Sequence, residues 1–220
     1  MPVRNEARQI QQLLDVLKPH AGLVLLVDGG SEDDTVTISH QQGFSVISSE
    51  AGRARQMNAG AQYAQADYYW FLHADCLPPH DAIEHILDAA GRGYQWGRFN
   101  VRLTGHQTIF RLIERMMNWR SCISQVATGD QGLFVSHELF QKTGGFPDIP
   151  LMEDIAISKL ARQREKPACI EHRVITSSRR WEQHGILRTI LLMWVLRLAY
   201  WLGVKPQTLH RLYYPENPGR

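Results

Sequence analysis

The chain has 220 residues, of which 44% are hydrophobic and 21% charged, which suits one large folded domain and excludes a disordered segment. Its net charge of +2 gives no overall field of the kind that nucleic-acid-binding proteins use. The cysteines Cys76, Cys122 and Cys169 are widely spaced and odd in number, which is typical of a reducing cytosol rather than of a disulfide scaffold or a zinc site. No export signal is visible at the N-terminus, so we expect a cytoplasmic protein.

Helices and strands alternate along the first 90 residues. A stripe of Ile10, Leu13, Leu14 and Leu17 predicts one face of the first helix. The expected helices lie at 5–18, 33–42, 55–66 and 78–90, and the expected strands at 22–27, 44–47 and 68–73. Such alternation is typical of βαβ units and a parallel sheet. No apolar strand precedes the first helix, so either the first strand is short or missing or the natural chain starts further upstream.

The second half of the chain is less regular. Strands are expected at 96–103 and 132–135, and helices at 107–119, 153–164 and 186–202. No repeat or linker separates the two halves, so we expect one domain over 1–185, followed by an apolar helix and tail over 186–220.

The C-terminal helix is apolar but interrupted by Arg188 and Arg197, which lie about two and a half turns apart and so point to opposite faces. A bilayer span normally needs about 20 apolar residues without charges. We therefore interpret 186–202 as a helix on the surface of the domain or of a membrane, where Trp194 and Trp201 can sit at an interface. Core cover and membrane contact are both open.

Two apolar runs end abruptly at a carboxylate. Leu25-Leu26-Val27 stops at Asp28, and the run from Trp70 stops at Asp75. In open α/β sheets ligands bind just outside the carboxyl ends of the strands. These two aspartates, with the later pair Glu153-Asp154, therefore predict a site for a metal and a phosphorylated ligand.

The order and spacing of four motifs resemble those of family 2 glycosyltransferases with a GT-A fold. The motifs are Pro2-Val3-Arg4-Asn5-Glu6, 27–35, His73-Ala74-Asp75 and Glu153-Asp154. Segments 52–58, 128–132 and 179–182 resemble a small bacterial subgroup whose substrate is unassigned. The resemblance implies an α/β fold with a mostly parallel central sheet flanked by helices. It also implies sugar transfer from a nucleotide-diphosphate sugar, with a UDP-sugar as the expected donor, to an unidentified acceptor hydroxyl.

The resemblance implies Mg²⁺ or Mn²⁺ as cofactor and Asp75 as its ligand. A divalent cation stabilises charge on a leaving diphosphate, and it often takes only one or two carboxylates from the protein. The family motif is usually Asp-x-Asp, and His73 stands at the first position here. The alternative for Asp75 is a helix N-cap before Pro78-Pro79.

Three further residues are expected at the nucleotide. The resemblance implies that Asp28 binds the nucleotide base or ribose. The alternative is that the Asp28 side chain only stabilises its own turn at Gly29-Gly30. Arg53 precedes a helix and can meet the base or diphosphate, or can simply be solvated. Glu6 belongs to the same pocket by motif.

The resemblance implies that Asp154 is the general base that takes the proton of the acceptor hydroxyl. Direct transfer with one base and no covalent intermediate inverts the anomeric configuration. Glu153, Asp130, Arg180 and Trp181 are the expected substrate-binding residues, since carboxylates suit sugar hydroxyls and an Arg beside an aromatic suits a diphosphate and a sugar face. The alternative for Asp154 is a plain acidic residue in the first turn of a helix, and the alternative for Asp130 is an aspartate that stabilises a turn. The alternative for Arg180 and Trp181 is a cation–π pair at the surface.

Two other functions fit part of the pattern. A nucleotidyltransferase also uses a strand-end aspartate and a metal, but it typically opens with a Gly-rich phosphate loop, which this chain lacks near its N-terminus. A non-catalytic nucleotide-sugar-binding or membrane-attached scaffold fits the weakened metal motif at His73. A lipid-borne acceptor would fit peripheral contact of 186–202 with the cytoplasmic face of a membrane.

Overall fold

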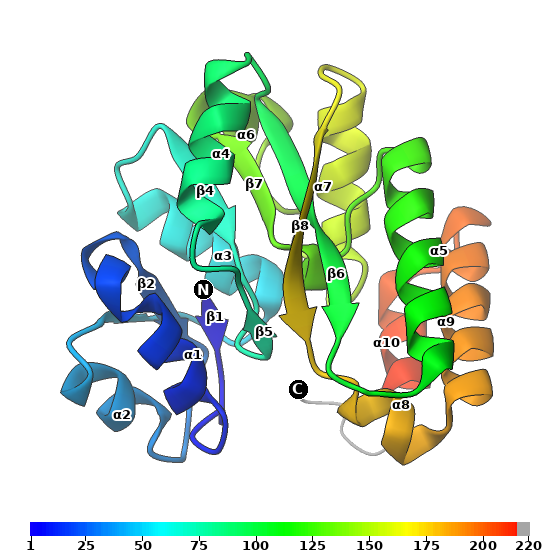
Figure 1. The fold of residues 1–220 in the computed structure, drawn as a ribbon, viewed down its shortest axis with the longest axis horizontal. Coiled ribbons are helices and arrows are strands. Elements are labelled where there is room, and N and C mark those ends of the chain that lie inside the picture. The colour runs from blue at the N-terminus through cyan, green and yellow to red at the C-terminus, as the bar shows by residue number, and fades with distance from the viewer. Residues whose placement is uncertain (215–220) are drawn as a thin grey trace.

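A computed structural model describes residues 1–214, and it contains two β-sheets with helices packed around them (Figure 1). The first sheet has three parallel strands in the order β1-β2-β3. These strands are β1 (Pro2–Val3), β2 (Leu25–Asp28) and β3 (Ser45–Ser48). The first strand is thus present but only two residues long. Because Val3 pairs with Asp28 and Asp28 with Ser48, all three strands end at the same edge.

The helices of this first part cover the small sheet. They are α1 (Ile10–Leu17), the short 3₁₀ helix η1 (Lys18–Leu23) and α2 (Thr35–Gln41). The predicted stripe of α1 is confirmed, since its four apolar residues are all buried. The helix begins at residue 10 rather than 5, because Asn5 has a φ of 55° and therefore lies outside helical backbone.

The second sheet is mixed and has five strands in the order β4-β7-β6-β8-β5. The β6–β8 pair is parallel, and the β4–β7, β6–β7 and β5–β8 pairs are antiparallel. The strands are β4 (Tyr68–Phe71), β5 (Cys76–Leu77), β6 (Trp96–Leu103), β7 (Leu133–Ser136) and β8 (Ala168–Thr176). Strand β6 has the predicted bounds, whereas β5 and β8 were not expected. The parallel pairing expected from the sequence thus holds within the first sheet and between β6 and β8.

Eight helices and one 3₁₀ turn complete the part of the chain that the structure describes. They are α3 (Arg53–Tyr63), α4 (Ala82–Gly91), α5 (Thr108–Ser124), η2 (Gly129–Gln131), α6 (His137–Thr143), α7 (Glu153–Arg162), α8 (Arg179–His184), α9 (Ile186–Trp201) and α10 (Pro206–Tyr213). The short helices α6, α8 and α10 were not expected. In Figure 1, α5, α9 and α10 lie together on one side of the mixed sheet.

The core of the mixed sheet depends on close contact between three strands at Gly97 of β6. A Cβ atom at this position would lie 2.5 Å from the carbonyl oxygen of Ala168 and 2.6 Å from the ring of Phe134. Trp96, Phe99 and Phe134 are almost fully buried around it. Only glycine therefore lets β7 and β8 approach β6 from both sides.

Two of the three cysteines are paired, which corrects the expectation of reduced, widely separated thiols. Cys122 on α5 and Cys169 on β8 form a disulfide with a Cα–Cα distance of 6.0 Å, and Cys76 is free and buried. The sequence spacing of 47 residues hides this proximity. It arises because α5 packs along β6, which is the parallel neighbour of β8.

The C-terminal helices pack on the start of α7 and on α5. Leu196 of α9 and Leu209 of α10 are buried against Met152 and Ile155, and Ile186 and Ile190 pack against the α5 side chains around Phe110. Within residues 1–214, no helix combines the length and the apolar character that a bilayer span requires.

Candidate functional site

Three of the sequence motifs meet at Gly129. The ring of His73, which follows β4, lies so close that a Cβ at Gly129 would be 2.1 Å from its Cε1 atom. On the other side, the Gly129 N–H donates to Oδ2 of Asp154 at 2.7 Å. The Ile155 N–H donates to Oδ1 of the same carboxylate at 2.7 Å. The Asp154 side chain is thus fixed by two backbone donors next to the end of β4.

Strained backbone precedes two of the predicted acidic residues. Met152, with a φ of 71°, directly precedes Glu153, and Asn5, with a φ of 55°, directly precedes Glu6. Left-handed backbone at a buried Met is costly and persists only where the surrounding structure holds it. At Glu6, the backbone N–H donates to Thr35 Oγ1 at 2.8 Å, which fixes the loop.

The carboxyl groups of Glu153, at the start of α7, and of Asp130, in η2, have raised pKa values. Burial, followed by the charge of Asp154, raises the pKa of Glu153 to about 7. Burial and the charge of Asp75 raise the pKa of Asp130 to about 6. For Glu153 the loss of hydration therefore outweighs the helix N-terminus, which favours a negative charge.

Asp75 lies exposed just after β4, where a divalent cation could reach it. Among the described residues, its carboxylate has one hydrogen-bond partner, the Cys76 thiol, at 3.6 Å from Oδ1. Burial, then the charge of Arg53, lowers the pKa of His73 to about 4, so the residue in place of the first family aspartate is neutral. One free carboxylate fits a cation that takes most of its oxygens from a diphosphate and water.

Arg53 lies at the N-terminus of α3 and faces several groups of the site. Burial lowers its pKa, but the nearby Tyr214 hydroxyl and the charges of Glu153 and Asp75 more than offset this and raise it. Glu6 interacts electrostatically with the same groups. Burial raises its pKa, the charge of Asp75 raises it further, and the charge of Arg53 lowers it. The structure therefore brings these predicted nucleotide-binding residues together.

Asp28 organises its own turn, as the alternative interpretation of the sequence expected. Its carboxylate accepts hydrogen bonds from the N–H groups of Gly30 and Ser31 and from the Ser31 hydroxyl. The buried side chain of Gln56 packs against Gly29 and donates to the carbonyls of Val3 in β1 and Val27 in β2. These contacts fix the turn after β2, and a contact of Asp28 with a nucleotide stays a prediction.

Arg180 and Trp181 point to different surroundings. The Arg180 guanidinium stacks on the ring of Tyr213, 3.6 Å from its centroid, and donates to the Tyr213 carbonyl at 3.1 Å. Trp181 packs instead into the apolar cluster of Leu103 and Phe110. The cation–π pair foreseen as an alternative thus forms, but with a tyrosine of α10 that the sequence did not indicate.

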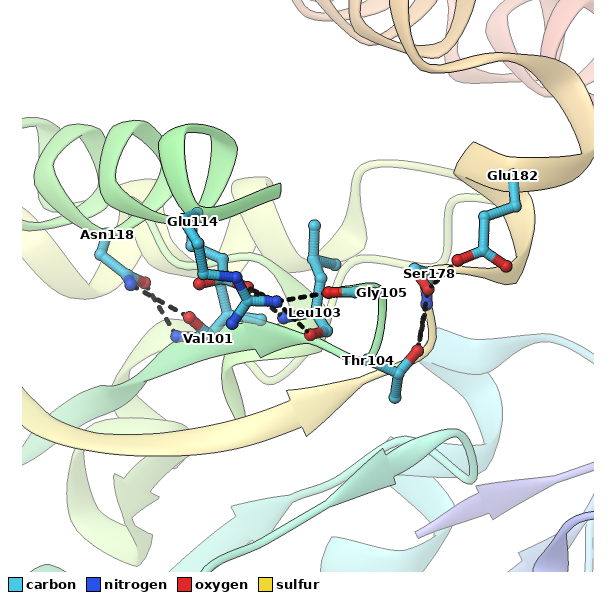
Figure 2. Close-up of polar contacts among 9 residues, drawn as sticks. Val101, Leu103, Thr104, Gly105, Glu114, Asn118, Ser178 and Glu182 are labelled. Carbon is cyan, nitrogen blue, oxygen red and sulfur yellow. Dashed lines mark hydrogen bonds and ion pairs between the residues drawn. The ribbon is translucent and has the colours of Figure 1, made fainter. Parts of the chain in front are cut away.

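Polar contacts in Figure 2 hold α5 along β6 and join the ends of β6 and β8. The carboxylate of Glu114 on α5 accepts from the Leu103 N–H at 2.7 Å, and Asn118 exchanges hydrogen bonds with the backbone of Val101. The hydroxyls of Thr104 and Ser178 lie 2.8 Å apart. The ends of β6 and β8 are thereby joined where α8 begins.

Sequence reasoning did not indicate that two arginines lie near Asp154. Arg120 of α5 and Arg197 of α9 both interact electrostatically with Asp154. An arginine within an otherwise apolar helix was the available signal for Arg197, but the sequence did not show which way it faces.

A second acidic and histidine cluster lies at α4 and β8. Ligand atoms of Asp81, His85 and His172 lie within 4.8 Å of one another, the only such set of three found in residues 1–214. The His85 and His172 rings stack with centroids 3.5 Å apart and planes at 25°. Stacked rings direct their nitrogen lone pairs side by side rather than toward one point, so we assign no cation to this cluster.

The arrangement of strands and helices is the GT-A fold that solved glycosyltransferase structures share. Among solved structures, TarS from S. aureus in complex with UDP aligns with a TM-score of 0.65 at 14% identity, covering 80% of this chain and 58% of that one. Glucosyl-3-phosphoglycerate synthase from M. tuberculosis in complex with Mn²⁺, UDP-glucose and phosphoglyceric acid aligns with a TM-score of 0.61 at 21% identity, covering 78% of this chain and 68% of that one.

Sequence comparison identifies the family. The family model described as "Glycosyl transferase family 2" matches residues 1–129, and the chain belongs to this family. An uncharacterized glycosyltransferase of Mycobacterium tuberculosis strain H37Rv is 32% identical over 131 residues, which cover 56% of this chain. The match spans half the length of that relative.

Proposed function

We propose that the protein transfers a sugar from a nucleotide-diphosphate sugar to an acceptor hydroxyl, with inversion at the anomeric carbon. The observation that carries this proposal is the meeting of His73, Gly129 and Asp154, which sets a fixed carboxylate beside the end of β4. A UDP-sugar is the proposed donor. The neighbouring structures that contain UDP or UDP-glucose in this fold support that choice.

In the proposed reaction, Asp154 acts as general base. Each carboxylate oxygen accepts one backbone N–H and keeps a lone pair for the acceptor hydroxyl. As the acceptor oxygen bonds to the anomeric carbon, its proton passes to Asp154. The bond from that carbon to the diphosphate breaks, and its electron pair leaves with the diphosphate. One displacement of this kind inverts the configuration.

The donor side is formed by the residues around Asp75. Asp28, Glu6 and Arg53 are proposed to hold the nucleotide, with Asp75 as protein ligand of Mg²⁺ or Mn²⁺. Such a cation would offset charge on the leaving diphosphate. Asp130, Glu153, Arg180 and Trp181 are proposed to meet the substrates. We assign this chemistry to 1–185. We propose that the helix and tail of 186–220, of which 215–220 lie outside the described residues, pack on the domain or on the membrane surface.

Two carboxylate variants test the assignment of roles. Calorimetry with UDP and Mn²⁺ should show binding that Asp75→Ala weakens strongly and Asp154→Asn leaves nearly intact. Release of UDP from a panel of UDP-sugars should be lost in Asp154→Asn. Asp148→Asn is the matched control, because Asp148 is exposed and pairs with Arg55 at 3.0 Å. Retained turnover in Asp154→Asn would remove it as the base, and binding without turnover in the intact protein would favour a scaffold.

We also propose peripheral membrane contact through the outer face of α9. Trp194 and Trp201 are 64% and 73% exposed there, and Trp119 on neighbouring α5 is 71% exposed. Apolar surface of this extent usually marks a contact site. The exposed arginine Arg188 adds positive charge that suits an anionic bilayer.

Flotation with anionic vesicles tests this contact. The intact chain should float, and a Leu191→Glu/Leu198→Glu variant should not, since both leucines are exposed on α9. Leu87→Glu is the control, because Leu87 is equally exposed on the distant helix α4. An intact protein that remains in the soluble fraction would instead assign this face to a protein contact.

A further inference from the structure

Two arginines on separate helices lie near Asp154, the proposed general base. The proposed reaction assigns no role to either of them. Arg120 of α5 and Arg197 of α9 both lie close enough to Asp154 to interact with its charge. Arg197 also interacts with Asp130, and Arg120 interacts with Arg197 and with Arg98 of β6. The guanidinium groups of Arg98, Arg120 and Arg197 therefore form a series of interacting neighbours. This series extends from β6 to Asp154, on the proposed acceptor side of the site.

Among the described residues, the guanidinium groups of Arg120 and Arg197 lack a partner of opposite charge at short range. No ion pair within 4.0 Å in residues 1–214 involves Arg120 or Arg197. The Nη2 atom of Arg120 is buried and has no hydrogen-bond partner. Arg98, by contrast, donates to the carbonyl of Asn118 at 2.9 Å.

Holding this arrangement costs free energy. Burial, followed by the charge of Arg197, lowers the pKa of Arg120 to about 10, and burial lowers that of Arg197. Both side chains still carry their charge at neutral pH. Unpaired, partly buried like charges destabilise the fold unless an anion joins them. The nearby carboxylate of Asp154 does not serve this purpose fully, because it forms no ion pair with either arginine within 4.0 Å in residues 1–214.

We propose that Arg120 and Arg197 bind an anionic group of the acceptor, a phosphate or a carboxylate. The inference rests on the proposed function, because it takes Asp154 as the base that meets the acceptor hydroxyl. Planar guanidinium groups match such oxyanions with paired hydrogen bonds. The donor diphosphate belongs with Arg53 and Asp75 at the strand ends, so the anion beside Asp154 is that of the acceptor.

The same two helices expose apolar side chains on their outer faces, Trp119 on α5 and Trp194 on α9. An acceptor phosphate can therefore come from a lipid or from a soluble molecule. Both sources share the chemistry that the arginines recognise, and the experiment separates them.

Inorganic phosphate is the first probe, titrated by calorimetry with UDP and Mn²⁺ present to fill the donor side. We expect phosphate to bind the intact protein, and Arg197→Gln or Arg120→Gln to weaken it on the order of tenfold or more. Arg188→Gln is the matched control, because Arg188 is exposed on the same helix as Arg197. Arg197→Lys keeps the positive charge but loses the paired N–H donors of the guanidinium. Its phosphate affinity should therefore fall between those of the intact protein and of Arg197→Gln. Equal phosphate binding in all variants, or none in the intact protein, overturns the proposal.

UDP binding in the same variants separates this proposal from the proposed function. It should be unchanged, and folding should be intact by circular dichroism, since removing one of two neighbouring positive charges relieves repulsion. A parallel loss of UDP and phosphate binding in Arg197→Gln would assign the arginines to the donor and overturn the inference. If UDP binds neither the intact protein nor any variant, the proposed function fails. The phosphate titration without UDP would still measure binding at the two arginines.

Vesicles identify the source of the anion. Phosphatidylcholine vesicles containing phosphatidic acid present a lipid phosphate monoester, and vesicles containing phosphatidylglycerol present similar surface charge without one. A preference for phosphatidic acid that Arg197→Gln abolishes supports a lipid-borne acceptor. Arginine-dependent binding of inorganic phosphate without that preference supports a soluble anionic acceptor.

Discussion

Replacing Glu153 by glutamine should stabilise the protein above neutral pH. Glu153 is 3% exposed at the start of α7, and burial raises its pKa from the usual 4.5 to about 7. Between these pH values the folded chain binds more protons than the unfolded chain, so stability falls as pH rises. The full difference corresponds to roughly 3 kcal/mol, since one pKa unit equals about 1.4 kcal/mol.

Urea unfolding of the two proteins at pH 5 and pH 8 measures this effect. At pH 5 the folded wild-type protein carries a protonated Glu153, so the two free energies of unfolding should be similar. At pH 8 the Glu153→Gln variant should be more stable by up to about 3 kcal/mol, because it has no charge to bury.

Glu138→Gln provides a control with the opposite sign. Its hydrogen bond with Lys142 lowers the pKa of Glu138, so this substitution should not stabilise the protein at pH 8. A Glu153→Gln variant that equals or falls below the wild type at pH 8 would refute the reasoning. It would mean that Arg53 compensates the buried charge.

Three further substitutions test contacts elsewhere in the fold. Gln56→Ala removes the donor to two buried strand-end carbonyls and should lower the free energy of unfolding by about 2 kcal/mol in urea; a change near zero would contradict this. Leu196→Ala empties a side-chain position that is 1% exposed and should cost roughly 3 kcal/mol in the same assay, whereas a small loss would show that α9 packs loosely. Gly129→Ala should displace His73 and reduce UDP release from UDP-sugars, with UDP affinity as the check on folding; unchanged turnover would argue against a fixed His73–Asp154 geometry.

The sequence by itself determined the elements whose side-chain pattern is local. The apolar stripe of α1 and the apolar run of β6 predicted the buried face of the helix and the bounds of the strand. The strand-end aspartates and the Glu153-Asp154 pair likewise predicted an acidic site, because apolar runs that stop at carboxylates are visible in the sequence alone. The roles assigned to these residues stay predictions.

The tertiary structure alone decided which distant residues meet. Strand β8 was missed because the polar residues 171–173 interrupt its apolar pattern, and its pairing with β6 stabilises it as a strand. The packing of α5 along β6 brings Cys122 to Cys169. The rotation of α9, set by the burial of Leu196, turns Arg197 toward Asp154. Helical periodicity gives the relative directions of side chains, but only packing against other elements fixes which face points into the site.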